Sequence, residues 1–193
     1  MIFEPSPSGT IQSTPIAFCG KYFRGFALYP HLCISVSPDG YRRRIRSPFA
    51  EKLFQTLFNG DTGNMEEIAE IFSRGIITLF GNTPFDCLLI VPPPTSRRNY
   101  APAIRLMNSI SSKSGILSLQ YAIRQIQNRS RSDQAEFCFT SETVNDVYTG
   151  KNIIVITDFF RSGRTLRALT TFLAENGKAA SVFVLAGTII RKE

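Results

Sequence analysis

A short stretch near the end of the chain carries residues that could hold a sugar phosphate. Ser162 and Thr165 supply hydroxyl donors, and Gly163 lets the backbone approach a ligand closely. If a helix begins here, its unpaired N–H groups and its dipole favour a phosphate at the same place. Asp158 precedes this turn, where the hydroxyls or a metal-bound diol of a ribose 5-phosphate would lie. The pattern predicts a ribose-phosphate cradle, and the alternative is an ordinary strand–turn–helix of an α/β sheet.

The segments on both sides of the turn predict the elements that would position it. Residues 153–156 form an apolar run typical of a buried strand. Residues 165–175 predict a helix with one apolar face, which carries Leu166, Leu169, Thr170 and Leu173. A strand followed by an acid, a glycine turn and a helix would bring the acid and the turn to one edge of a sheet.

This stretch resembles the phosphoribosyl-pyrophosphate signature of type I phosphoribosyltransferases. In that signature an apolar strand is followed by two acids, two apolar residues and a Thr/Ser-Gly-x-Thr loop. Asp158 matches the second acid, whereas Thr157 stands in the place of the first. The resemblance implies that this pair contacts the ribose hydroxyls and that the loop binds the phosphate. The matching loop residues are Arg161, Ser162, Gly163, Arg164 and Thr165.

A second loop could bind the pyrophosphate part of such a ligand. Residues 87–91 predict a short apolar strand that runs directly into Pro92, Pro93 and Pro94. The prolines prevent further strand or helix, so they hold a stiff turn at the carboxyl edge, where α/β sheets bind ligands. The resemblance implies a pyrophosphate-gripping role for the residues that follow, Thr95, Ser96, Arg97 and Arg98. The alternative is a surface loop with solvated charges.

The middle of the chain predicts a helix over residues 101–112 and a strand over residues 117–123. The polar stretch 124–149 then follows, and loops of this length are usually lids or disordered segments. In the family a flexible loop closes over the reacting centre and excludes water. Arg129 and Arg131 would then reach the pyrophosphate, with solvated positions as an equal alternative. This order of segments, over residues 86–188, is similar to the ComF-like branch of these proteins, named for the competence protein ComF.

The first part of the chain has a different character. Aromatic and β-prone residues over 16–37 and 41–45, separated by the turn 37–40, predict a small antiparallel meander. Ser47 and Pro48 favour the start of a helix that ends at Asn59 and Gly60, and residues 65–80 predict another. The predicted division is a flexible arm (1–15), the meander with two helices (16–83) and a phosphoribosyltransferase-like core (84–193). The predicted fold class is α/β, with a central parallel sheet flanked by helices.

Composition limits the partners of this chain. Of its 22 basic residues 16 are arginine, and the net charge of +7 favours phosphorylated ligands or a nucleic-acid backbone. The run Arg42, Arg43, Arg44 and Arg46 is either a solvated hairpin flank or a binding patch. No apolar run approaches the roughly 18 residues of a membrane span, so we expect a cytoplasmic protein. The dispersed cysteines favour buried thiols over a zinc site.

The sequence leaves three functions open. If the chain is an enzyme, the resemblance implies displacement of pyrophosphate from phosphoribosyl pyrophosphate by a nitrogen nucleophile, with Mg²⁺ bridging pyrophosphate and ribose. Asp158, Arg97 and Arg98 would be catalytic, and Asp158 would contact the metal through ligand or water. The alternative is a catalytically degenerate nucleotide-sensing or nucleic-acid-associated module, which the ComF-like resemblance would place in a DNA uptake, repair or defence system. The third is an interaction subunit whose N-terminal segment docks a protein partner, and the chain could form an oligomer.

Overall fold

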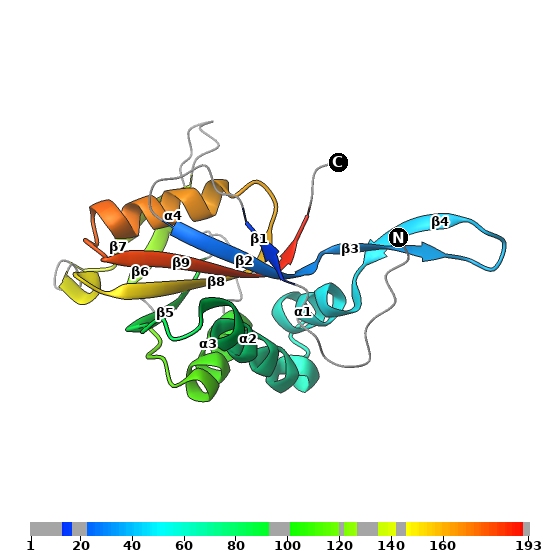
Figure 1. Ribbon diagram of the computed structural model, residues 1–193, viewed down its shortest axis with the longest axis horizontal. Helices are drawn as coiled ribbons and strands as arrows, with labels where there is room; N and C mark the ends of the chain where they lie inside the picture. Colours follow the sequence, from blue (N-terminus) through cyan, green and yellow to red (C-terminus); the bar gives the residue numbers. More distant parts are fainter. Residues whose placement is uncertain are drawn as a thin grey trace.

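A five-stranded sheet forms the centre of the molecule in the order β1-β2-β9-β8-β5 (Figure 1). The computed structural model describes residues 13–16, 23–92, 101–119, 122–126, 135–141 and 146–190. The strands are β1 (Thr14–Pro15), β2 (Phe23–Pro30), β5 (Cys87–Ile90), β8 (Asn152–Phe160) and β9 (Ser181–Ile189). All neighbouring pairs are parallel except β1 with β2. The predicted α/β class is therefore confirmed, and the short antiparallel β1 makes the sheet mixed.

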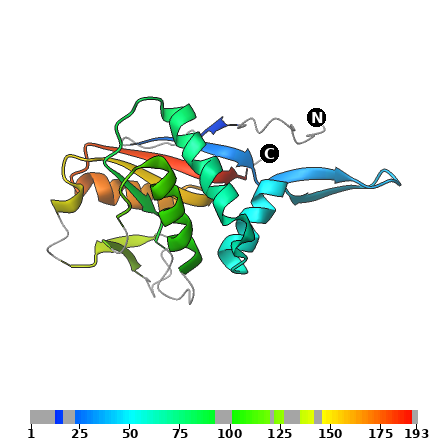
Figure 2. The ribbon, with the colours of Figure 1, turned by 90° about the horizontal axis from the view of Figure 1, so that it is seen from below.

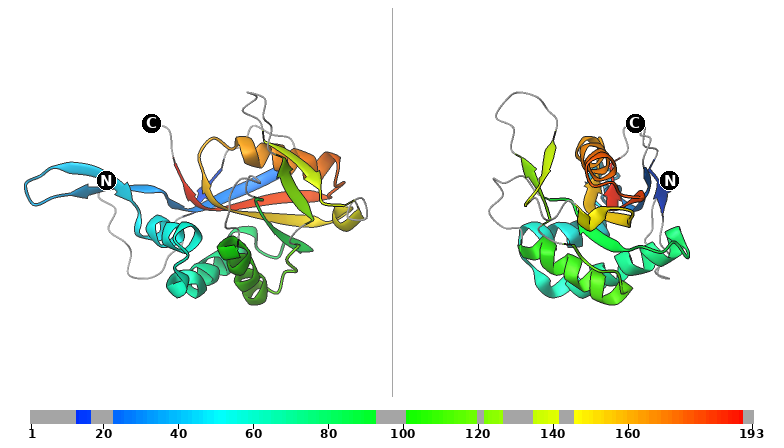
Figure 3. Two further views of the ribbon diagram at one scale, coloured as in Figure 1. Left: turned by 180° about the vertical axis from the view of Figure 1, so that it is seen from behind. Right: turned by 90° about the vertical axis from the view of Figure 1, so that its left-hand side faces the viewer.

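Helices cover both faces of this sheet. Helices α1 (Pro48–Phe58), α2 (Met65–Phe80) and α3 (Ala101–Ser114) lie on one face, with the 3₁₀ turn η1 (Thr62–Asn64) between the first two (Figures 1 and 3). Helix α4 (Arg164–Glu175) lies on the other face, beside the small hairpin of β6 (Ile123–Ile126) and β7 (Glu136–Phe139). The helices thus leave the carboxyl edge of the parallel strands as the place where a ligand can meet the sheet.

The core has two layers because β8 is buried on both faces. Side chains alternate across a strand, so Ile154 and Ile156 pack among α1, α2 and α3, whereas Ile153 and Val155 pack towards α4. All four are at most 1% exposed. This double burial explains why the strand is a continuous apolar run.

Local sequence signals account for the helices. The Ser47 side chain accepts a hydrogen bond from the Ala50 N–H at 3.3 Å, Pro48 is the first helical residue, and Asn59 caps the end of α1. The bounds of α2 are those predicted, and Gly81 with its positive φ ends it. Helix α4 buries Leu166, Leu169, Thr170 and Leu173, the apolar face predicted for it.

The N-terminal strands differ from the predicted meander. Strand β2 belongs to the central sheet, where it pairs in parallel with β9 from Phe23↔Val182 to Pro30↔Ile189. Besides the two-residue antiparallel pairing of β1 with β2, the predicted meander is represented by one hairpin, β3 (Leu32–Val36) with β4 (Arg42–Arg46), and Figure 2 shows this hairpin extending away from the body. The physical reason is burial, because Ala27 and Leu28 are completely buried in the sheet and a two-stranded hairpin could not cover them.

Two further segments differ from the prediction. Of the strand expected over 117–123, the described residues 117–119 contain a bridge between Ser118 and Leu88, and residues 122–123 lead into β6, which begins at Ile123 and pairs with β7. The polar stretch 124–149 therefore contains part of a hairpin. Strand β8 also continues past Ile156 to Phe160, since its pairing with β9 extends to Phe160↔Ile189.

Among the helices in the described ranges, none has the length and apolar character that a membrane crossing requires.

Candidate functional site

The turn between β8 and α4, for which a phosphate cradle is predicted, consists of a left-handed glycine at the start of a helix. Gly163 is buried and adopts the left-handed conformation, with φ 69° and ψ 5°, at the N-cap of α4. No side chain caps this described helix end, and the first helical hydrogen bond runs from the Arg167 N–H to the Gly163 carbonyl at 2.8 Å. The N–H groups of the first turn are thus directed to the carboxyl edge of the sheet.

The other predicted cradle residues lie around this glycine. Arg161 and Ser162 are exposed on the turn, Arg164 is exposed at the start of α4, and Thr165 is half-buried in the same first turn. Burial of Leu166 and Leu169 fixes the direction of the helix behind them. The two arginines therefore add positive charge to a helix end that already favours an anion.

Thr157 and Asp158 lie within β8, because the strand continues beyond them. The Thr157 hydroxyl donates to Asp158 Oδ1 at 3.2 Å, and the Phe159 N–H donates to the same oxygen at 2.8 Å. Thr157 is only 6% exposed. Thr157 thus stabilises the charge of the Asp158 carboxylate by a hydrogen bond and carries no charge itself.

The structure brings two unpredicted polar residues to Asp158. His31 directly follows β2 and Thr188 lies near the end of β9, so the parallel sheet places both at the carboxyl edge. His31 Nδ1 and Thr188 Oγ1 are 2.9 Å apart, and the Thr188 hydroxyl donates to the Asp158 carbonyl at 3.4 Å. Since a carbonyl can only accept, both bonds form together when His31 Nδ1 carries the proton. That tautomer leaves Nε2 as an acceptor.

These three residues line a cavity of about 190 Å³ between the sheet edge, the root of the β3–β4 hairpin and α1. The remaining lining side chains are Arg46, Ala50, Leu53, Phe54, Phe58 and Phe159. Phe159 is 40% and Phe58 45% exposed, so two aromatic rings flank the opening. The cavity therefore combines one carboxylate, one imidazole and one guanidinium with aromatic walls.

Electrostatics keep His31 neutral near pH 7. Burial lowers the pKa of His31, nearby Arg46 lowers it further, and Asp158 opposes both by raising it. The net direction is downward from the ordinary value of 6.5. A neutral imidazole can accept a hydrogen bond or a proton from a ligand in the cavity.

The donor set fits a cation that a ligand brings with it. Within the described ranges there is no group of three or more His, Cys, Asp or Glu side chains that could hold a metal. Mg²⁺ often takes only one or two carboxylates and completes its shell with substrate phosphates and water. Asp158 is the carboxylate that lines the cavity, so it would be the side chain there that contacts such a cation, directly or through water.

Several predicted residues lie outside the described ranges. These are Thr95, Ser96, Arg97, Arg98, Arg129 and Arg131. Among the cysteines, Cys19 also lies outside, and Cys87 is buried with its pKa raised by burial to about 11. Cys33 and Cys138 are partly exposed, which corrects the expectation of uniformly buried thiols.

Sequence reasoning missed His31, Thr188 and Arg46 because their proximity to Asp158 depends on β2. Once residues 23–30 are assigned to the parallel sheet, His31 falls at its carboxyl edge beside the ends of β8 and β9. The available signal was the apolar core of β2, Ala27 and Leu28, which needs cover on both faces.

No protein-family model matches the chain, and no curated protein sequence matches it either. Among solved structures, the fold is similar to a hypoxanthine phosphoribosyltransferase from Staphylococcus aureus, with 15% identity, 67% of this chain and 75% of that chain covered, and a TM-score of 0.43. It is similar to a hypothetical protein from Neisseria gonorrhoeae with bound ppGpp, with 16% identity, 67% and 69% coverage, and a TM-score of 0.47. It is also similar to the adenine phosphoribosyltransferase from Saccharomyces cerevisiae, with 11% identity, 83% and 92% coverage, and a TM-score of 0.45.

Proposed function

We propose that this protein binds phosphoribosyl pyrophosphate, or a related ribose phosphate, at the turn between β8 and α4. The observation that carries the proposal is the buried, left-handed Gly163 at the uncapped start of α4, shortly after Asp158 in the chain. Glycine adopts this conformation without a steric penalty and lets a ligand approach the backbone closely, and a helix N-terminus favours a phosphate. A cytoplasmic location is part of the same proposal.

Each cradle residue has a role in this proposal. The N–H groups of the first turn of α4, with the hydroxyls of Ser162 and Thr165, hold the 5-phosphate. Asp158 orients the ribose hydroxyls, and its Oδ1 already has two donors that stabilise the charged carboxylate. Arg161 and Arg164 strengthen the attraction for a polyanion. On the sequence resemblance, the pyrophosphate is held by Thr95, Ser96, Arg97 and Arg98, with Arg129 and Arg131 reaching it from the polar stretch.

The enzymatic form of the proposal is transfer of the phosphoribosyl group to a nitrogen nucleophile. Pyrophosphate leaves as the new bond to nitrogen forms, so the protein must stabilise the charge of the departing group and hold the ribose in line. Arg97 and Arg98 are assigned to the first task and Asp158 to the second. A bound Mg²⁺ would neutralise part of the pyrophosphate charge. No covalent intermediate with the protein is required.

One observation favours a binding protein without turnover as the second candidate. Thr157 is buried and donates to Asp158, so only one carboxylate of the expected pair remains to orient the ribose. The loop also carries two arginines, which suit a larger polyphosphate. A nucleotide sensor, or a module associated with nucleic acid in DNA uptake, repair or defence, would use the same cradle for recognition alone.

Calorimetry separates these possibilities. Phosphoribosyl pyrophosphate is titrated with and without Mg²⁺, beside nucleoside monophosphates and inorganic phosphate, and pyrophosphate release is measured with a panel of bases. Asp158→Asn should weaken Mg²⁺-dependent binding by about tenfold, about 1.4 kcal/mol, and change phosphate binding little. Asp146→Asn removes an exposed carboxylate elsewhere and serves as the matched control.

The outcomes are distinct. Binding with product formation selects the transferase, and binding without product selects the sensor. If no ribose phosphate binds, or if Asp158→Asn weakens phosphate and phosphoribosyl pyrophosphate equally, the assignment of Asp158 and the cradle is wrong.

A further inference from the structure

The β3–β4 hairpin projects from the body as a two-stranded arm (Figures 1 and 2). Its register runs from Leu32↔Arg46 at the root to Val36↔Arg42 near the tip. The turn is closed by the hydrogen bonds from the Ser37 N–H to the Tyr41 carbonyl at 3.0 Å and from the Gly40 N–H to the Ser37 carbonyl at 2.8 Å. The arm therefore has a defined register along its whole length.

One face of the arm carries a row of aliphatic side chains from β3 beside a row of arginines from β4. Cross-strand partners share a face, so Leu32, Ile34 and Val36 lie beside Arg46, Arg44 and Arg42 respectively. Ile34 is 55% and Val36 50% exposed, and every residue of β4 is exposed. Arg43 lies on the opposite face, where its guanidinium stacks 5.6 Å from the centre of the Tyr41 ring. Positive charge is thus present on both faces of the arm.

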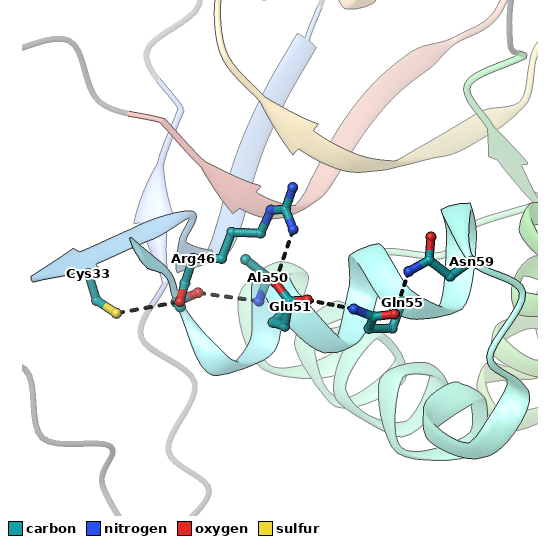
Figure 4. A network of polar contacts seen from close by, with 7 residues as sticks. Cys33, Arg46, Ala50, Glu51, Gln55 and Asn59 are labelled. Carbon is teal, nitrogen blue, oxygen red and sulfur yellow. Dashed lines mark hydrogen bonds and ion pairs between the residues drawn. The ribbon is translucent and has the colours of Figure 1, made fainter. Parts of the chain in front are cut away.

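The root of the arm is held firmly against α1, as Figure 4 shows. Arg46 Nη1 donates to Glu51 Oε2 at 3.0 Å, and its guanidinium lies 3.7 Å from the centre of the Phe54 ring. Cys33 Sγ contacts the Arg46 carbonyl at 3.6 Å. The Ser47 N–H donates to the His31 carbonyl at 2.9 Å, which ties the two ends of the arm together. Arg46 is thus part of the attachment, whereas Arg42, Arg43 and Arg44 lie farther out.

We propose that the arm enters the major groove of B-form DNA and that Arg42, Arg43 and Arg44 bind its phosphates. The major groove admits a two-stranded ribbon of this kind, and its walls are the two phosphate backbones, which attract a basic ribbon. The arm carries four arginines and one acid, Asp39, within a chain of net charge +7. The aliphatic row offers apolar contact to thymine methyl groups in the groove. This role is independent of the ribose-phosphate site.

Two other occupants fit the arm less well. A second copy of the chain would bring one arginine-rich strand close to another, which like charges oppose. The arginines could also serve only to protect the open strand edges of the arm against aggregation, and in that case the arm would bind no ligand. Duplex RNA has a deep and narrow major groove that side chains cannot read, so a groove-inserted ribbon should discriminate against it.

Fluorescence anisotropy with a labelled DNA duplex of about 20 base pairs, measured over a range of salt concentrations, tests the proposal. The variant Arg42→Gln/Arg43→Gln/Arg44→Gln should bind at least about tenfold more weakly, and the slope of log K against log salt should fall by about 2 to 3. The matched control Arg74→Gln/Arg105→Gln/Lys178→Gln removes three exposed charges from the body and should keep the slope of the wild type. Circular dichroism checks that both variants fold.

Three results would overturn the proposal. The first is that the wild type shows no salt-dependent binding to DNA. The second is that both triple variants lose the same DNA affinity, and the third is that the wild type binds a duplex RNA of the same length as tightly as the DNA. The arm variant is also titrated with phosphoribosyl pyrophosphate. Its affinity for this ligand should equal that of the wild type, so failure of the arm proposal can be told apart from failure of the ribose-phosphate site.

Discussion

Individual hydrogen bonds decide what the carboxyl edge of the sheet can do. Asp158 Oδ1 has the Thr157 hydroxyl and the Phe159 N–H as donors, and the Asp158 carbonyl accepts from Thr188. His31 completes this chain of contacts through Thr188. The edge therefore presents one carboxylate beside one neutral imidazole, and both can be tested by single substitutions.

Restoring the missing acid with Thr157→Asp should raise the affinity for phosphoribosyl pyrophosphate by about tenfold, about 1.4 kcal/mol, when Mg²⁺ is present. A carboxylate adds charge-assisted contacts to the ribose and its cation, whereas the threonine hydroxyl makes neutral ones of about half the strength. Without Mg²⁺ the gain should disappear, because two adjacent carboxylates repel each other. Calorimetry with and without the cation measures both effects.

Thr157→Asn is the control for this variant. Asparagine has the size of aspartate without its charge, so Thr157→Asn should show no gain in affinity for phosphoribosyl pyrophosphate. If the wild type turns over rapidly with some base and Thr157→Asp slows it, the site is a working transferase with its own ribose contacts.

The pKa of His31 predicts a loss of stability in mild acid. Burial and Arg46 lower the pKa of His31 below 6.5, whereas the unfolded chain titrates near 6.5. As pH falls below about 6.5, the unfolded state takes up the proton first, so the free energy of unfolding should decrease until the folded pKa is reached. Above about pH 6.5 this contribution is constant. Urea unfolding at about pH 5.5 to 7.5 should show the slope, and His31→Gln should flatten it.

His31 is the sole histidine of the chain, so its imidazole resonances can be assigned directly. A titration midpoint above 6.5 would show that the attraction of Asp158 outweighs burial and would contradict this prediction.

Close approaches between elements hold the site in place. The turn before α4 depends on one left-handed glycine, and the contact of α1 and α2 with the sheet depends on another glycine, Gly187 in β9. A Cβ at Gly187 would lie 2.8 Å from both the Asp158 carbonyl oxygen and Leu53 Cδ2, and 3.1 Å from Phe72 Cζ. These glycines connect the packing of the helices to the position of Asp158.

Gly163→Val should abolish phosphoribosyl pyrophosphate binding while the chain still folds. A β-branched residue disfavours φ near 69° and would cover the N–H groups of the turn. Gly150→Val carries the same backbone strain, since Gly150 also has φ 69°, but it precedes β8 at the amino end. Both variants should lose similar stability in thermal melts, and Gly150→Val should bind normally in calorimetry. Unchanged binding by a folded Gly163→Val would remove the cradle assignment.

Gly187→Ala should lower the free energy of unfolding by about 1–3 kcal/mol, because the added methyl meets a backbone oxygen that cannot move aside. Gly75→Ala is an instructive comparison. Its methyl would lie 2.6 Å from Leu28 Cδ2, the end of a flexible side chain, and alanine is favoured over glycine in a helix by about 1 kcal/mol. Urea unfolding should therefore show a clearly smaller loss for Gly75→Ala, and equal losses would contradict the role assigned to the Asp158 carbonyl.

The molecule as a whole is organised around the pairing of its first long strand with its last. Strand β9 lies between β2 and β8, so residues from both ends of the chain share the centre of one sheet. Leu28 from the N-terminal segment belongs to the same core as Ile154 and Leu185. Residues from both sides of the predicted boundary at 83 and 84 thus pack in one core. Whether the two predicted parts can fold independently stays a prediction.

A fragment of residues 84–193 should fail to fold by itself. It would expose one edge of β9 and the face of the sheet that α1 and α2 cover, including Ile156 and Leu185. Circular dichroism and thermal melting of the fragment check this, and a cooperative transition like that of the full chain would contradict it. Replacing residues 33–45 by a short glycine linker is the control. The Ser47 N–H to His31 carbonyl bond shows that the arm's ends already meet, so this deletion should leave the core folded.

Local patterns were sufficient for the helices and for the glycine turn before α4, because a cap, a helical period or a glycine turn acts over a few neighbouring residues. Ser47 and Pro48, the apolar face of α4 and the sequence from Asp158 to Thr165 could therefore be recognised in the printed chain. Strand partners are chosen by contacts between distant residues, so the place of β2 beside β9 and the extension of β8 to Phe160 required the folded chain. The meeting of His31, Thr188 and Asp158 follows from that pairing, because parallel strands bring their carboxyl ends together only when their order in the sheet is known.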